Sequence, residues 1–138
     1  MIVVDTSFVY ALLDRRDSRH DEAVAWYRQI DEEMATTPLV LAEADHLAVS
    51  RAGVKAARAF RDDLRAGAYI VEWWPEAATQ CAELAEQYEG LGIGLTDASL
   101  VVLADRLGTA RLATFDERHF RAVRPLGGGS FAIFPMDA

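Results

Sequence analysis

The chain has 138 residues, 51% of them hydrophobic, so it can form one domain with a buried core, and extended disorder is excluded. A formal charge of −8 argues against a broad basic surface for nucleic acid, and the single cysteine, Cys81, excludes an internal disulfide. No apolar run approaches the ~20 residues that cross a bilayer, and Met1–Val4 is too short for a signal-peptide core. We expect residues 1–138 to form a single cytoplasmic domain with no membrane partner.

Short apolar segments bounded by turn residues predict five strands. They are expected at about Ile2–Val4, Ala35–Thr37, Tyr69–Glu72, Arg111–Thr114 and Phe131–Phe134. Helical patterns lie between them, at Ser18 to about Glu33, Pro38–Arg51, Lys55–Ala66, Glu76–Tyr88 and Asp97–Leu107. Strands that alternate with helices predict an α/β domain with a central, mainly parallel sheet.

Four acidic residues occupy positions where the local pattern predicts burial or a place in a cleft. Asp5 ends the first strand, Glu43 interrupts an apolar helix, Asp97 opens another helix, and Asp116 follows the fourth strand. Like charges about 4 Å apart repel by roughly 4 kcal/mol at the effective dielectric of a protein surface, and a divalent cation removes that cost. Oxygen-only ligands favour Mg²⁺ or Mn²⁺, so the pattern predicts a metal site.

Helical periodicity places two of these acids. Glu43 shares a face with Val40 and Leu47, which predicts that it points to the apolar side. Asp97 shares a face with Leu100 and stands in the first turn, where helix capping alone is an equally good interpretation. Asp5 or Asp116 taken singly could be turn residues, but the four acids together favour the metal site.

Arginines form two clusters that could meet phosphate. The first follows helical spacing through residues 51–65 and is equally compatible with a solvated helix face, because Asp62 and Asp63 are interleaved with it. The second lies beside Asp116 and provides the candidate RNA-binding residues Arg118 and Arg121. We expect the three histidines to lie on the surface or in loops, although His119 could contact phosphate.

Four segments of the chain resemble a known family. They are Val-Val-Asp5-Thr6-Ser7, Thr37-Pro38-Leu-Val-Leu-Ala-Glu43, Gly94-Leu-Thr-Asp97-Ala-Ser-Leu and Ala113-Thr114-Phe115-Asp116-Glu-Arg-His-Phe120. Their order and spacing resemble the PIN-domain ribonucleases, and within them the VapC-type toxins of bacterial type II toxin–antitoxin systems. The resemblance covers Ile2 to Pro135 and implies a PIN-like three-layer α/β/α domain.

The resemblance also implies roles for single residues and for partners. Asp5, Glu43, Asp97 and Asp116 match the acidic quartet that holds Mg²⁺ or Mn²⁺ in these nucleases, with Glu43 reaching the metal directly or through water. Ser7 matches the hydroxyl residue that supports the site, and Thr114 is a further candidate support. The implied activity is hydrolysis of RNA phosphodiesters, with a VapB-type antitoxin and a second copy of the chain, in a homodimer, as partners.

Two other functions compete with this interpretation. An aspartate-based phosphohydrolase would use Asp5 as nucleophile, but a second aspartate two residues later is absent and the lone lysine, Lys55, lies on a polar helix. A non-catalytic module that binds RNA or an antitoxin would use the acids only to hold arginine side chains. That alternative predicts RNA binding that needs no metal.

Overall fold

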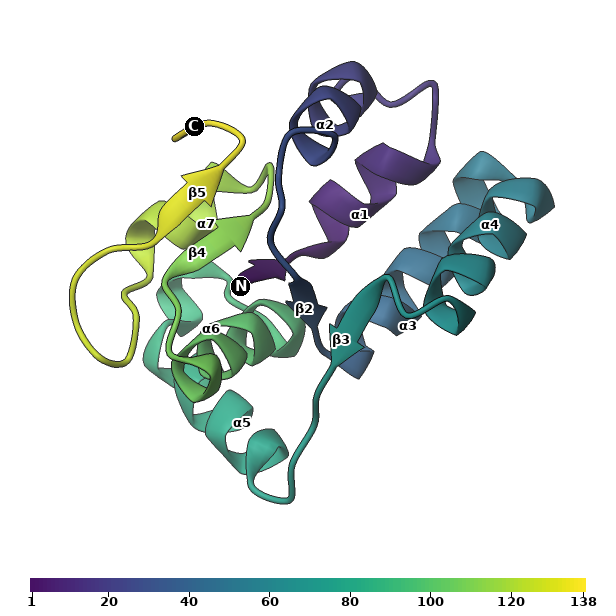
Figure 1. Cartoon of the computed structure of the whole chain (residues 1–138). Helices are drawn as coiled ribbons and strands as arrows, with labels where there is room; N and C mark the ends of the chain where they lie inside the picture. Colours follow the sequence, from purple (N-terminus) through teal and green to yellow (C-terminus); the bar gives the residue numbers. More distant parts are fainter.

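A computed structural model describes residues 1–138 and contains a five-stranded sheet with helices on both faces (Figure 1). The strands are β1 (Ile2–Val4), β2 (Met34–Thr36), β3 (Tyr69–Val71), β4 (Arg111–Ala113) and β5 (Ala132–Phe134). The α-helices are α1 (Thr6–Leu13), α2 (His20–Tyr27), α3 (Pro38–Leu47), α4 (Val54–Arg65), α5 (Ala77–Gln87), α6 (Leu95–Leu107) and α7 (Glu117–Ala122). A π-helical segment, η1 (Ala48–Ala52), joins α3 to α4, and a 3₁₀ turn, η2 (Glu89–Leu91), precedes α6.

All neighbouring strands run parallel, in the order β3-β2-β1-β4-β5. The chain therefore builds the sheet outward from β1 in one direction and later returns to β1 to continue with β4 and β5. Ligands in such sheets bind beyond the carboxyl ends of the strands at the point where the order reverses. Here that point lies between β1 and β4, which Asp5 and Asp116 follow.

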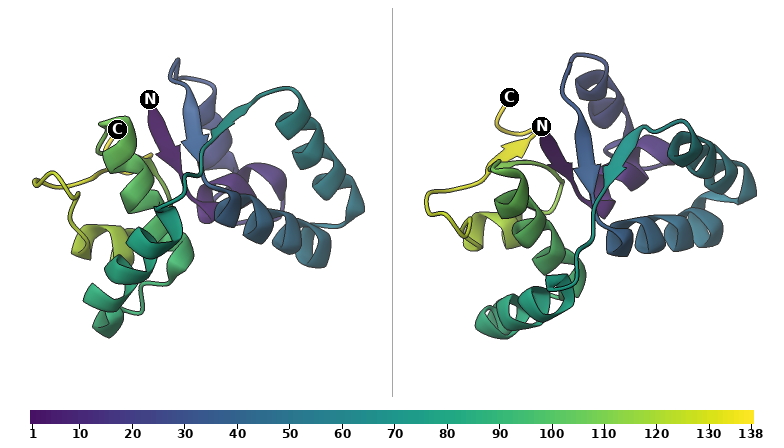
Figure 2. Two further views of the ribbon diagram at one scale, coloured as in Figure 1. Left: turned by 90° about the horizontal axis from the view of Figure 1, so that it is seen from below. Right: turned by 60° about the horizontal axis from the view of Figure 1, so that its bottom comes forward.

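Helices cover both faces of the sheet (Figure 2), and an apolar layer lies between the helices and each face. Successive strand residues point to opposite faces, so Val3 packs in the layer formed with α5 and α6, while Ile2 and Val4 pack with α1, α2 and α4. Both faces are covered, and β1 is wholly buried as a result. The predicted three-layer α/β/α arrangement with a parallel sheet is confirmed, and no helix combines the length and apolar composition needed to span a bilayer.

The structure adds two helices that the sequence analysis did not predict. Asp5 caps α1, because its side chain accepts a hydrogen bond from the Thr6 amide, and Asp116 caps α7 by accepting one from the His119 amide. In both places a strand turns into a helix within three residues, and the acid at the turn satisfies an amide that has no partner within the helix.

Two other predicted helices differ from the structure. The helix expected from Ser18 to about Glu33 begins at His20, without a side-chain cap, and ends at Tyr27, because the chain must extend again to enter β2. The helix predicted over Pro38–Arg51 is α-helical only to Leu47 and continues as the π segment η1. Gly53 ends this segment with φ of 99°, a left-handed conformation that glycine adopts at little cost.

Candidate active site

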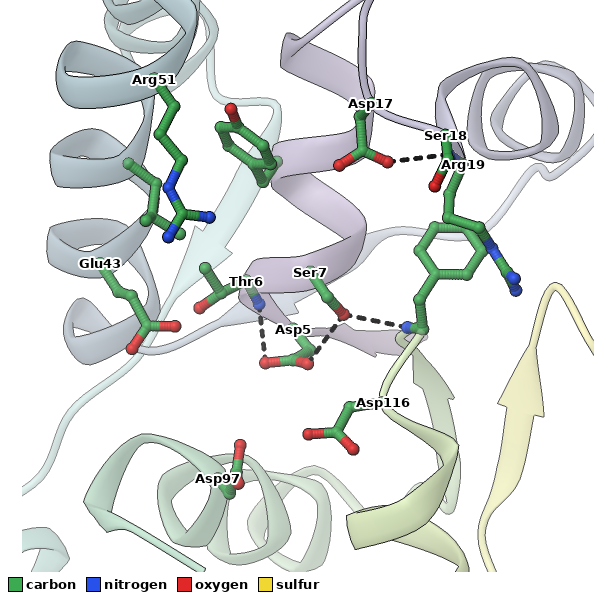
Figure 3. A pocket seen from close by; sticks show the side chains of 13 residues that line it. Asp5, Thr6, Ser7, Asp17, Ser18, Arg19, Glu43, Arg51, Asp97 and Asp116 are labelled. Atoms are coloured by element: carbon green, nitrogen blue, oxygen red, sulfur yellow. Dashed lines mark hydrogen bonds between the residues drawn. The ribbon is translucent and has the colours of Figure 1, made fainter.

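A cleft of about 360 Å³ opens at the carboxyl ends of β1 and β4 (Figure 3). Its walls come from the start of α1, the loop before α2, the α3–η1 segment, the start of α6 and the turn after β4. The four predicted acids all line it. The full lining is Asp5, Thr6, Ser7, Tyr10, Asp17, Ser18, Arg19, Glu43, Leu47, Arg51, Asp97, Phe115 and Asp116.

Asp5 is the most deeply placed acid, with 5% of its surface exposed. Its Oδ1 accepts a hydrogen bond from the Thr6 amide at 2.7 Å, and its Oδ2 accepts from the hydroxyls of Thr114 at 2.7 Å and Ser7 at 3.1 Å. Burial raises the pKa of Asp5, and the hydrogen bonds from Thr114, Thr6 and Ser7 act in the opposite direction. The carboxylate is therefore held in one orientation with no basic side chain beside it.

Ser7 and Thr114 extend this network to the turn after β4. The Ser7 hydroxyl accepts from the Phe115 amide at 2.9 Å, and the Thr114 hydroxyl accepts from the Asp116 amide at 2.9 Å. The two hydroxyls lie 3.1 Å apart. They thus connect the Asp5 carboxylate to the backbone that carries Asp116, which is the geometry expected of groups that support metal ligands.

Asp97 and Asp116 face each other across an imidazole. The Nδ1 atom of His119 lies 2.9 Å from Oδ2 of Asp97 and 2.9 Å from Oδ2 of Asp116. One ligand atom from each of these three residues falls within 4.8 Å of the others, a spacing that can hold a metal ion. His119 stands one turn after Asp116 in α7, so its role was missed because the sequence analysis placed no helix there.

The pKa of the Asp97 carboxyl is raised in the folded protein. Burial, together with the nearby Asp5 and Asp116 carboxylates, raises its pKa to about 6, although His119 acts in the opposite direction. The residue also lies in the first turn of α6, where the helix dipole favours a negative charge. Three aspartates that converge on one space, with a single imidazole between two of them, match the oxygen-rich ligand sets of hard divalent cations.

Glu43 occupies a different environment from the one predicted. It points into the cleft from α3, as Figure 3 shows, but its side chain is exposed and does not pack on the apolar side of the helix. The buried face of α3 is instead formed by Val40 and Ala44, which contact the two apolar layers of the sheet. Glu43 therefore lies at the cleft wall, across from the aspartates.

The two predicted RNA-binding arginines do not line this cleft. Arg121 donates to both carboxylate oxygens of Asp137, at 2.7 and 2.9 Å, and also to Glu117. Arg118 is exposed on α7 and forms no ion pair. Arg19 and Arg51 are the basic residues of the cleft. Arg51 belongs to the first predicted arginine cluster, whereas Arg19 was not predicted, and only the fold brings these two distant residues to one cleft.

Comparison with known proteins agrees with the fold. The family model described as PIN domain matches residues 2–125. Ribonuclease VapC26 of Mycobacterium tuberculosis is 35% identical over 135 residues, which cover 97% of this chain and all of that protein. The crystal structure of Mycobacterium tuberculosis VapC20, described as a sarcin-ricin loop cleaving toxin, superposes with a TM-score of 0.79 at 25% identity, over 85% of this chain and 91% of VapC20.

A more distant structure shares the fold alone. FitAcB from Neisseria gonorrhoeae superposes with a TM-score of 0.60 at 20% identity, over 87% of this chain and 91% of the other. The family model and the VapC26 match both extend over most of the chain, and the range of the family model contains the positions of all four predicted acids. The chain therefore belongs to the PIN-domain family, among its VapC-type ribonucleases.

Proposed function

We propose that this protein is a Mg²⁺- or Mn²⁺-dependent endoribonuclease toxin that a cognate VapB-type antitoxin neutralises. The observation that carries the proposal is the convergence of Asp5, Asp97 and Asp116 from three separate elements on one cleft, with His119 as the single nitrogen ligand candidate nearby. The names of the relatives support RNA as the substrate and toxicity as the role.

Each residue of the site has a proposed role that follows from its position. Asp5, Asp97 and Asp116 would hold the cation, and Glu43 would act from the opposite wall, directly or through a water molecule. A divalent cation bound there supplies Lewis acidity, which promotes attack of water on phosphorus near neutral pH and neutralises charge on the phosphate. Ser7 and Thr114 orient the Asp5 oxygens toward the cleft through their hydrogen bonds. His119 holds the Asp97 and Asp116 carboxylates close together, because its Nδ1 atom contacts both.

The proposal extends to partners and place of action. It includes an antitoxin that covers the acidic cleft, a homodimer of this chain and action on cytoplasmic RNA, as the resemblance to VapC-type toxins implies, and the relative named as a ribonuclease supports the RNA substrate. Arg118 remains a candidate contact for RNA outside the cleft, because its guanidinium is exposed and free of ion pairs. Co-expression with a cognate antitoxin should relieve the growth arrest that the toxin would cause, and light scattering of the purified chain should give the mass of two copies.

The structure favours this activity over a phosphohydrolase. Lys55, the lone lysine, does not line the carboxylate cleft but a separate hollow between α1 and α4. A nucleophilic aspartate would therefore lack a lysine to bind the phosphate beside it.

The decisive experiment uses the purified protein with total cellular RNA in the presence of Mg²⁺, Mn²⁺ or EDTA. We expect new 5′ ends at defined positions with either metal, none in EDTA, and none with a folded Asp97→Asn variant. Asp105→Asn, an exposed acid on the same helix, is the matched control and should cleave like the wild type. A folded wild-type protein that binds RNA but leaves it intact with both metals would instead support a non-catalytic module.

A further inference from the structure

Arg51 stands apart from the other basic residue of the cleft because its guanidinium has no partner. Arg19 is held by Glu22 at 3.2 Å, and its guanidinium lies 4.5 Å from the centre of the Phe115 ring. The Arg51 side chain forms neither an ion pair nor a hydrogen bond, although five acidic residues line the same cleft. Figure 3 shows it extending over the cleft above Glu43. The side chain is thus free to bind an anion that enters.

The π-helical segment explains why Arg51 faces the cleft. Four residues of an α-helix rotate by about 40° more than a full turn, and this excess adds up along the helix. A side chain eight residues after Glu43 would therefore point well away from the Glu43 direction. A π turn closes with a longer hydrogen-bonded ring and contains more residues, which reverses this drift. The Gly53 amide donates to the Ala48 carbonyl at 2.8 Å in that pattern. Glu43, Leu47 and Arg51 consequently line the cleft as one row.

The backbone that carries Arg51 is held by a contact from the loop after α1. Nη2 of Arg16, in the loop after α1, donates to the Arg51 carbonyl at 2.7 Å. This bond satisfies one of the carbonyls that the end of the helical segment leaves without a partner. It also fixes the α3–η1 wall relative to α1, so the position of the arginine over the cleft is built into the fold.

Charge in the cleft indicates what the free guanidinium binds. An RNA strand that approaches Asp5, Asp97 and Asp116 meets a protein of formal charge −8, so general electrostatic attraction contributes little. A planar guanidinium presents a fork of donors that matches two phosphate oxygens. We propose that Arg51 positions the substrate by binding a phosphate of the RNA strand next to the one that is cleaved. This inference rests on the ribonuclease function proposed above.

The test measures binding and cleavage separately. Binding of a short, fluorescently labelled single-stranded RNA is titrated in EDTA over a range of salt concentrations, and KM and kcat are then measured with Mg²⁺. Arg51→Gln should raise both Kd and KM roughly tenfold and leave kcat near the wild-type value, because a charge-assisted bidentate contact is lost. The slope of log K against log salt should become shallower by about 0.7, the value for one phosphate contact on a single strand.

Two further variants make the result specific. Arg58→Gln removes the same charge from an exposed, unpaired arginine on α4 outside the cleft, and its Kd, KM and salt slope should match the wild type. Arg51→Lys should restore the salt slope but only part of the affinity, because an ammonium lacks the guanidinium fork. Equal melting temperatures for all three variants would show that the fold is intact.

The outcomes separate this inference from the function on which it rests. If the wild type binds and cleaves RNA while Arg51→Gln behaves like Arg58→Gln, the role of Arg51 is overturned and the nuclease stands. If the wild type neither binds nor cleaves RNA, the proposed function fails and the role of Arg51 fails with it.

Discussion

The buried hydroxyl of Thr114 contacts two separate parts of the site. It donates to Asp5 and accepts from the Asp116 amide, so a single oxygen connects two candidate metal ligands that are more than a hundred residues apart. From the sequence alone, Thr114 was predicted only as a possible support of the site. Its contacts depend on the pairing of β1 with β4, which neither strand encodes alone.

We expect Thr114→Val to lower RNA cleavage by roughly 10–100-fold, the range seen when groups that support metal ligands are removed. The valine would also leave buried polar groups unpaired, at a cost of about 1–3 kcal/mol in the free energy of unfolding. Thr36→Val is the matched control, since its buried hydroxyl donates to the Val4 carbonyl at 2.9 Å and contacts no site acid. Equal activity losses in both variants would contradict the supporting role.

Asp97 makes the stability of the metal-free protein depend on pH. Its pKa is raised from 3.8 to about 6 in the folded protein, chiefly by burial, so the folded state binds more protons than the unfolded state between these values. The contribution of this group to stability therefore falls as the pH rises from about 4 to about 6, and the full cost of its charge is present at pH 7.5.

Asp97→Asn should accordingly raise the melting temperature of the metal-free protein at pH 7.5 by several degrees, since ~1 kcal/mol corresponds to roughly 4 °C in a domain of this size. The gain should disappear near pH 4, where the wild-type carboxyl is protonated. Asp105→Asn should give no gain at either pH. A loss of stability at pH 7.5 in Asp97→Asn would show that the charge is compensated without metal.

At the scale of elements, turns decide where the functional side chains point. Asp5 and Asp116 are each the cap of a short helix, so the bond that starts the helix also orients the carboxylate. The π segment and its terminal Gly53 do the same for Arg51. The strands and longer helices were predictable from apolar periodicity, whereas α1, α7 and the π turn were not, because their stability comes from capping and packing.

Gly53 provides the test at this scale. Its φ of 99° is one that side-chain-bearing residues rarely adopt, and a Cβ there would meet no atom within 4 Å, so the cost of Gly53→Ala is backbone strain alone. We expect a loss of about 1–3 kcal/mol in the free energy of unfolding by urea. Gly127→Ala, in equally open space without a positive φ, should be nearly neutral. An unchanged free energy of unfolding in Gly53→Ala would mean that η1 can relax to a backbone conformation that alanine adopts without strain.

At the scale of the whole molecule, the fold gathers negative charge in one cleft, which a bound cation would compensate. Metal binding to the folded state alone should therefore stabilise the protein, by about 2.7 kcal/mol at a metal concentration 100 times Kd. We expect Mg²⁺ or Mn²⁺ to raise the melting temperature of the wild type and of Asp105→Asn but not of Asp5→Asn. The same rise in Asp5→Asn would place the bound ion elsewhere.

The sequence by itself determined the α/β class, the parallel sheet and the acids of the cleft. Apolar periodicity is a local property, and an uncompensated carboxylate beside an apolar segment is conspicuous wherever it occurs. Both features can be recognised without knowledge of tertiary contacts. Asp5, Glu43, Asp97 and Asp116 could therefore be selected as candidate site residues before the fold was known.

Only the tertiary structure decided which groups meet. The strand order sets β1 beside β4, and this brings Thr114 to Asp5, His119 between Asp97 and Asp116, and Arg51 over the same cleft. It also paired Arg121 with Asp137 and left Glu43 exposed on the cleft wall. The physical reason is that these contacts join residues distant in the chain, and a hydrogen bond or ion pair forms only where packing of the whole sheet has already brought its partners together.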